Sequence, residues 1–224
     1  MEIYLTRLLV AYFQRTIFLD FKKLEDDLRK IPAFDKANKN QFPSFGPTEI
    51  GIPVFELSSI TAPFSIVVFQ NKIEFSMNAV VPGQSYDDVF DSFFTLSNKL
   101  SQIVAPEDKE NMCGRIGIIN DSFIIDENPI NRIREKYFKK KSVENTVNLS
   151  LSFTKTIPTL ESFGAVEIAN VQQASINTTN QKGIYVRKDI NIPKEQTSIP
   201  AVRLNAFIDE SIKYMNKQEM MRLV

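Results

Sequence analysis

The sequence predicts an α+β protein in which an antiparallel sheet carries its helices on one side. One segment, Lys72 to Asn78, alternates apolar and polar residues with the two-residue period of a half-buried strand. Another, Ser85 to Val104, has its apolar residues at helical spacing. The order strand, short helix, two or three strands, long helix also occurs twice along the chain, at an offset of about 110 residues. Together these observations favour the α+β class and suggest two similar halves.

The first half is predicted to begin with a strand from Ile3 to Phe18, which is rich in β-branched and aromatic residues. Its mixed pattern leaves a helical alternative open. Asp20 is a candidate N-cap for a short amphipathic helix that ends before Pro32. Prolines and glycines then predict an irregular segment over residues 32–53.

A strand and a hairpin are predicted next. The strand covers Val54 to Ile60, and the hairpin joins Phe64 to Phe69 with Lys72 to Asn78. Alternation in the second hairpin strand predicts one buried face, which includes Ile73 and Phe75. The first half is then expected to close with the long helix.

That long helix is predicted to begin after Ser85, where Asp88 completes a spacing typical of a capping box. The second half is predicted to consist of strands at 115–125, 143–153, 165–178 and 183–192, a short helix at 128–138 and a last helix at 200–222. Leu149 and Leu151 are expected to be buried in the strand predicted at 143–153. We expect one compact unit, 1–224, with pseudo-repeat halves 1–110 and 111–224.

The composition excludes several classes of enzyme. None of the 224 residues is a histidine, so the chain cannot assemble a Ser-His-Asp triad, a Cys-His dyad or a histidine-bearing zinc site. Cys113 is the single cysteine, which excludes an intrachain disulfide and predicts a structural thiol. We therefore expect a non-enzymatic protein without cofactor or metal. An enzyme that uses carboxylates alone, such as Glu74 or Asp121, stays open.

The N-terminal residues indicate the compartment. Met1 to Ala11 is apolar, but Glu2 and Arg7 interrupt it, so neither a signal-peptide core nor a membrane span is predicted. We expect a cytoplasmic protein that does not enter a membrane.

Basic residues gather near the predicted short helix of the second half. Such clusters bind phosphate backbones through counterion release, and the alternative is a solvated helix end. The candidate polyanion-binding residues are Arg132, Arg134, Lys136, Lys139, Lys140 and Lys141.

Apolar residues in two polar settings are candidates for partner contacts. Those in the irregular segment either form an interaction surface or fasten the segment to the core. Those at the C-terminus either dock onto another chain, including a second copy, or fold back onto the sheet of the first half. The candidate residues are Phe34, Phe42, Phe45, Met220, Met221 and Leu223.

Arg115 enters a predicted central strand two residues before Gly117. Its guanidinium is suited to an anion or to the carboxylate of a partner, because its donors match a bidentate pair. The alternative is an arginine at a strand end with an internal partner.

Three stretches resemble a poorly characterised family of sporadically distributed bacterial proteins: QNKIEFSMN from Gln70, SYDDVFDSF from Ser85 and RIGIIN from Arg115. The closing helix, Asn205 to Met221, resembles the C-terminal helix of that family. The family has no established activity, so the resemblance implies no catalytic residues. Its sporadic distribution implies a mobile-element or anti-phage setting as one hypothesis.

The leading hypothesis is a non-enzymatic interaction or scaffold subunit of a bacterial complex, acting through a protein partner or as a homo-oligomer. The alternative is a nucleic-acid-binding accessory protein that uses the basic residues 132–141.

Overall fold

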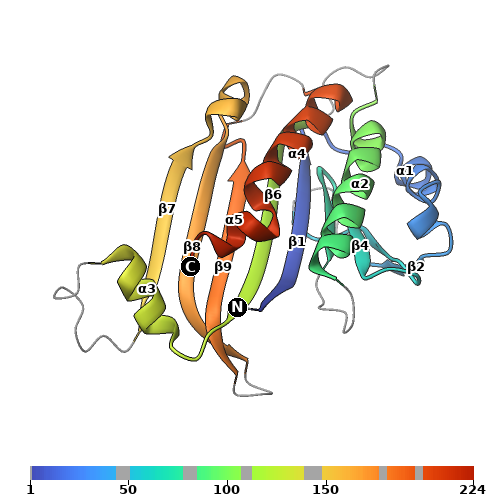
Figure 1. Cartoon of the computed structure of the whole chain (residues 1–224). Coiled ribbons are helices and arrows are strands. Elements are labelled where there is room, and N and C mark those ends of the chain that lie inside the picture. Colours follow the sequence, from blue (N-terminus) through green and yellow to red (C-terminus); the bar gives the residue numbers. More distant parts are fainter. Residues whose placement is uncertain are drawn as a thin grey trace.

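One antiparallel sheet organises the molecule, as the sequence predicts (Figure 1). The computed structural model describes residues 2–43, 51–77, 85–106, 113–138, 148–176, 181–194 and 199–224. The described strands form a nine-stranded sheet in the order β2-β3-β4-β5-β1-β6-β9-β8-β7. They are β1 (Ile3–Gln14), β2 (Asn38–Gln41), β3 (Phe55–Ser58), β4 (Phe64–Val68), β5 (Lys72–Met77), β6 (Cys113–Ile125), β7 (Ser150–Thr156), β8 (Val166–Ile176) and β9 (Gln181–Asn191).

The two long strands β1 and β6 lie side by side at the centre of the sheet. Val10 of β1 is opposite Ile118 of β6 on one side and Phe75 of β5 on the other. The strands β2 to β5 form a meander that returns to β1, and β7 to β9 form one that returns to β6. Residues far apart in the sequence therefore meet at the β1–β6 seam.

The helices lie on one side of this sheet. They are α1 (Phe21–Leu28), α2 (Tyr86–Val104), α3 (Pro129–Tyr137), α4 (Ala201–Met215) and α5 (Lys217–Met221), with short 3-10 helices at Pro32–Phe34 and Pro158–Phe163. In Figure 1, α2, α4 and α5 lie in front of the strands. The core forms beneath them, where for example the ring of Phe93 in α2 stacks on Phe75 with centroids 4.3 Å apart.

The buried apolar residues of both halves form one cluster on the helix side. Alternate residues of β1, among them Leu8, Val10 and Tyr12, point into this cluster and are fully buried. The intervening residues, such as Leu9 and Phe13, lie on the opposite face. No described helix covers that second face, but several of its side chains, Leu9 and Asp121 among them, are buried against their neighbours.

Most predicted elements are confirmed, and the structure corrects several details. The hairpin is present, with Ile73 and Phe75 fully buried. Asp20 caps α1 by accepting a hydrogen bond from the backbone N–H of Lys23 at 2.8 Å. Ser85 precedes α2, but its side chain makes no capping hydrogen bond. The predicted irregular segment 32–53 contains β2, a fully exposed strand at the end of the sheet.

The predicted final helix is two helices. Asn216 adopts an extended backbone (φ −65°, ψ 168°) and ends α4, and its side chain accepts a hydrogen bond from the N–H of Glu219 to begin α5. The predicted strand 143–153 is also different, because β7 begins at Ser150 and residues 139–147 lie outside the described ranges. Leu149 is buried as expected, whereas Leu151 is only half-buried because it lies on an end strand.

No helix in the described part of the chain is both long and apolar enough to cross a membrane.

Candidate functional site

A cluster of one aromatic ring and two cations lies on the uncovered face of the sheet, where β1 meets β5 and β6. Phe13 of β1 is opposite Lys72 of β5 and Arg115 of β6. The guanidinium carbon of Arg115 lies 4.1 Å from the centre of the Phe13 ring, and Lys72 Nζ lies 5.9 Å from it. Both distances are within the range of cation–π attraction, so the ring holds the Arg115 guanidinium in a defined position.

A hollow of about 300 Å³ opens beside this cluster. Its floor includes Ala11 and Gly117, which are opposite each other in the β1–β6 pair and are small enough to leave space above the sheet. The residues that line it are Leu9, Ala11, Phe13, Glu74, Arg115, Ile116, Gly117, Ile119, Asp189 and Asn191.

The polar residues of the hollow differ in whether they already have partners. Glu74 is paired with Lys72 at 2.6 Å, and Asp189 accepts a hydrogen bond from the Asn191 amide at 2.9 Å. The guanidinium of Arg115 makes no hydrogen bond or ion pair with any residue that the structure describes, and it is half-buried. Arg115 therefore presents donors to the hollow that an incoming acceptor could use.

A second charged group lies on the same face along β6 and β9. Arg187 donates from Nε and Nη2 to the two oxygens of Asp121, at 2.6 and 2.8 Å, and its Nη2 also donates to the Tyr185 hydroxyl at 3.1 Å. Burial and the nearby Asp121 carboxylate raise the pKa of Tyr185 to about 12. The hydrogen bonds from Arg187 to Asp121 raise the pKa of the guanidinium. Both acidic candidates for carboxylate chemistry, Asp121 and Glu74, are thus engaged in ion pairs.

Three of the six residues of the predicted basic cluster, Arg132, Arg134 and Lys136, are described, and all three lie on α3. Arg132 Nε pairs with Asp126 at 3.2 Å, and the ammonium group of Lys136 donates to the carbonyl oxygen of Arg222. Arg134 lines a different, polar hollow of about 590 Å³ beside α3, together with Lys182 and Glu127 among others. Lys139, Lys140 and Lys141 lie outside the described residues.

The three candidate phenylalanines of the irregular segment lie in different environments. Phe34 is fully buried, and its ring meets Phe75 edge to face at 6.1 Å. It therefore fastens the segment to the core, which was the alternative to a partner contact. Phe42 is half-buried and donates a backbone hydrogen bond to the Val54 carbonyl, while Phe45 is outside the described residues.

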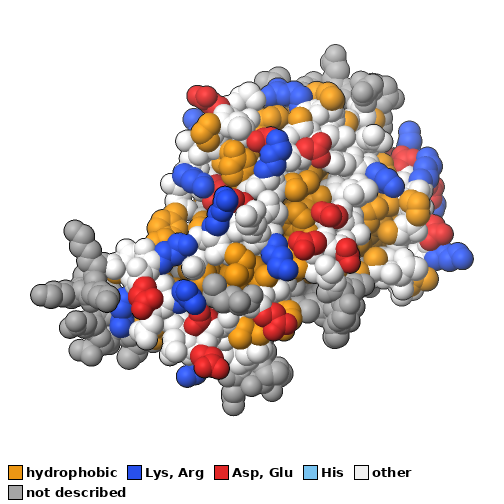
Figure 2. Space-filling view, in the orientation of Figure 1, with side chains coloured by type: hydrophobic (Ala, Val, Ile, Leu, Met, Phe, Trp, Pro, Cys, Tyr) orange, Lys and Arg blue, Asp and Glu red, His pale blue; other side chains and the backbone are white. Residues whose placement is uncertain are grey.

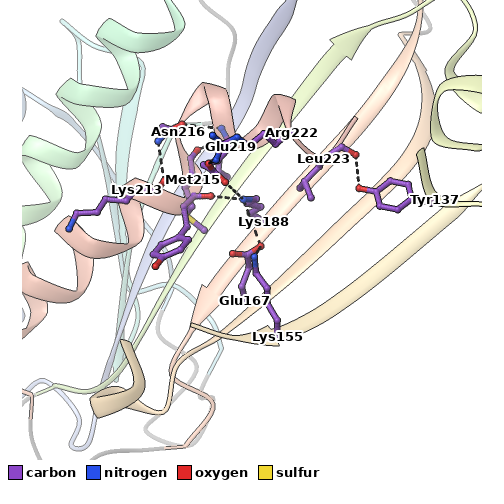
Figure 3. Close-up of polar contacts among 12 residues, drawn as sticks. Tyr137, Lys155, Glu167, Lys188, Lys213, Met215, Asn216, Glu219, Arg222 and Leu223 are labelled. Carbon is purple, nitrogen blue, oxygen red and sulfur yellow. Dashed lines mark hydrogen bonds and ion pairs between the residues drawn. The ribbon is translucent and has the colours of Figure 1, made fainter. Parts of the chain in front are cut away.

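The apolar C-terminal residues fold back onto their own chain, as Figure 3 shows for the polar contacts around α5. Met220 is fully buried and Val224 is 9% exposed, while Met221 and Leu223 are half-buried. The hydroxyl of Tyr137 in α3 donates to the Leu223 carbonyl at 2.7 Å. The sequence predicts that the C-terminal residues fold back onto the sheet of the first half. They instead contact α3 and β9, which follow residue 110 in the chain.

A buried lysine holds the junction between α4 and α5. Lys188 of β9 is 2% exposed, and its Nζ donates to the Tyr214 carbonyl at 2.6 Å, with Glu167 at 3.7 Å and Glu219 at 3.8 Å (Figure 3). Burial lowers the pKa of Lys188. Asn120 supports the same junction by donating to the Met215 carbonyl at 2.6 Å. This cluster is enclosed by the tail, so its role is structural.

Neither a reactive thiol nor a metal site is found in the described chain. Cys113 is fully buried, and burial raises the pKa of its thiol to about 12, as expected of a structural cysteine. No group of three or more Cys, Asp or Glu residues among those described is arranged to hold a metal ion. On the helix side, Figure 2 shows charged side chains of both signs interspersed with apolar ones, without a large field of one sign.

Comparisons with known proteins give no match: no protein-family model, no curated protein and no solved structure matches this chain. The site is therefore interpreted from its own residues.

The sequence pointed to Arg115 but not to the residues that surround it. The alternation over Lys72 to Asn78 predicts Lys72 on the polar face of its strand, whereas the mixed pattern of Ile3 to Phe18 assigns Phe13 to no face. Finding that they meet requires the register of β1 with β5 and β6.

Proposed function

We propose that the protein is a non-enzymatic interaction module that binds a partner protein on the uncovered face of its sheet and accepts an acidic side chain of that partner at Arg115. One observation carries the proposal: a half-buried arginine, held by the Phe13 ring, faces a hollow and has no carboxylate partner among the described residues. No nitrogen of Arg115 is among the described side-chain atoms that are buried without a partner, so water reaches its donors. An arriving carboxylate would exchange these water contacts for charge-assisted hydrogen bonds.

The other charges of the face support binding rather than catalysis. Glu74 and Asp121 are already engaged by Lys72 and Arg187, so neither is poised as a free base. The chain also lacks histidine. Paired charges around an arginine that has no acidic partner in the described ranges favour a partner protein with a matching acidic residue, because electrostatic complementarity selects partners and fixes their orientation.

We also propose that the two halves are equivalent units of a duplicated fold. The supporting observation is the sheet order, in which β1 and β6 meet at the centre and each pairs on its other side with the last strand of its own meander. The long helices α2 and α4 follow these meanders in the chain. The proposed partner surface would then lie across the seam between the units.

The test compares partner capture by the parent, Arg115→Glu and Lys30→Glu in cells that make the protein, with cross-linking before purification. Lys30 is an exposed residue just after α1, so its variant makes the same charge change away from the site. We expect a protein captured by the parent and by Lys30→Glu to be lost with Arg115→Glu, with cross-links on β1, β5, β6 or β9. Equal capture by all three proteins, or no capture by the parent, would contradict the proposal.

Nucleic-acid binding stays a second hypothesis. It depends on Lys139 to Lys141, because Arg132 and Lys136 already have partners within the chain.

A further inference from the structure

The two end strands of the sheet differ in how they are protected. Natural sheets protect their end strands by shortness, charge, proline, bulges or a covering element, because unpaired backbone groups there can pair with another chain. At one end, β2 has four residues, all polar and exposed. At the other end, β7 has seven residues, and among those described it pairs only with β8.

Within the described residues, β7 shows few of these protecting features, although the ring of Tyr137 in α3 lies 5.1 Å from the Phe153 ring on its helix side. Its register with β8 runs without a bulge from Ser150 opposite Gln172 to Thr156 opposite Val166. It contains no proline, and its single charge, Lys155, lies on the helix side with its ammonium 3.4 Å from Glu167. All residues of β7 except the half-buried Leu151 are exposed, and the large apolar side chain of Phe153 is 38% exposed. This strand can therefore accept another strand.

The sequence of β7 is nearly symmetric about Phe153. Hydroxyl residues occupy the positions one and three residues away on both sides, on the uncovered face of the sheet, at Ser150, Ser152, Thr154 and Thr156. The positions two residues away are Leu151 and Lys155, on the helix side with Phe153.

We infer that β7 pairs with the β7 of a second copy of this chain, antiparallel about a two-fold axis at Phe153, to join the two sheets. In this register Ser152 lies opposite Thr154 of the other copy, the two Phe153 rings are adjacent, and Lys155 faces Leu151. No like charges are opposed. A parallel pairing in register would instead place Lys155 beside its own copy.

The self-symmetric pattern is what favours a second copy over an unrelated strand. A two-fold axis requires residue i to meet residue j and j to meet i, and β7 satisfies this with matched hydroxyl pairs on one face. A seven-residue ladder is a small interface, so we expect a monomer–dimer equilibrium that depends on concentration. The inference uses a different surface from Arg115 and does not depend on the proposed function.

Two matched double variants test the register. Ser152 and Thr154 are both exposed on the uncovered face, so lysine or glutamate is tolerated there in the monomer. In S152K/T154K the proposed axis places lysine opposite lysine twice, whereas in S152K/T154E it places lysine opposite glutamate twice. We expect the dissociation constant, measured by sedimentation velocity at low salt, to be about tenfold or more weaker for S152K/T154K than for S152K/T154E.

The outcomes are distinct. A parent that dimerises, with S152K/T154K dissociated and S152K/T154E still dimeric, supports the inference. A parent that is monomeric up to its solubility limit overturns it. Equal dissociation constants for the two variants also overturn it, because the dimer would then use another surface. Thermal melts of all three proteins verify that the folded monomer is unchanged.

Discussion

Replacing Lys188 with methionine removes the buried charge beneath the α4–α5 junction while keeping the volume of the side chain. The variant loses the hydrogen bond from Lys188 Nζ to the Tyr214 carbonyl, which as a charged donor is worth about 1.5–3 kcal/mol. It also leaves Glu167, which is 1% exposed, with Lys155 as its one remaining cation among the described residues. Because breaking a buried ion pair from one side costs about 3–5 kcal/mol, we expect Lys188→Met to lower the free energy of unfolding by that amount.

The loss is measured by urea denaturation, where it corresponds to a midpoint lower by about 1–2 M at an unchanged slope. Lys188→Met combined with Glu167→Leu is the informative control. It removes both buried charges, so we expect it to lose only about 1–2 kcal/mol, mostly because the Tyr214 carbonyl and Lys155 each lose a partner. The reasoning is refuted if Lys188→Met is as stable as the parent, or if the double variant is less stable than the single one.

The remaining predictions concern the basic cluster, the core, the tail and the thiol. If residues 139–141 bind polyanions, the parent is retained on DNA or RNA at low salt and released steeply as salt rises, and replacing the three lysines with glutamate abolishes retention; a parent that is never retained contradicts this. Phe75→Ala should cost about 3–5 kcal/mol by calorimetry, since its ring is fully buried between other aromatic rings; a loss below about 1 kcal/mol would be inconsistent with the described core. Truncation after Lys217 should lower the melting temperature at unchanged solution mass, because it removes the buried Met220; a change of oligomer to monomer would show that the tail is an interface. The folded chain keeps the Cys113 proton up to about pH 12 while the unfolded chain releases it near pH 9.0, so stability should fall with rising pH across that interval and fall less in Cys113→Ala; parallel curves for the two proteins would argue against the buried thiol as a cause.

The parts of the fold that were predicted depend on local patterns. The β4–β5 hairpin was predicted because apolar residues alternate over Lys72 to Asn78 and a two-residue turn precedes them. The first helix was predicted because Asp20 and the apolar spacing after it specify a start and a face. Each of these signals lies within about ten residues of the element that it specifies.

Features that depend on distant partners were not predicted. The strand β2, Asn38–Gln41, is polar throughout and becomes a strand only because β3 offers it an edge. The break at Asn216 is not predicted because the apolar spacing continues through it. The junction between α4 and α5 is instead held by Lys188 of β9, which donates a hydrogen bond to the Tyr214 carbonyl. The stack of Arg115 on Phe13 joins residues about 100 positions apart, so the sequence could indicate the arginine but not the ring.

The central place of β1 also has a consequence during synthesis. The strand β1 is made before both of its neighbours in the sheet, and the second of them, β6, is made only after β2 to β5 and α2. Until β6 is made, the edge of β1 that pairs with it, which includes Leu8, Leu9 and Val10, has no partner strand in a partly folded first half. Exposed strand edges of this kind are prone to aggregation in vectorial folding, so the arrival of β6 removes an aggregation-prone edge from the growing chain.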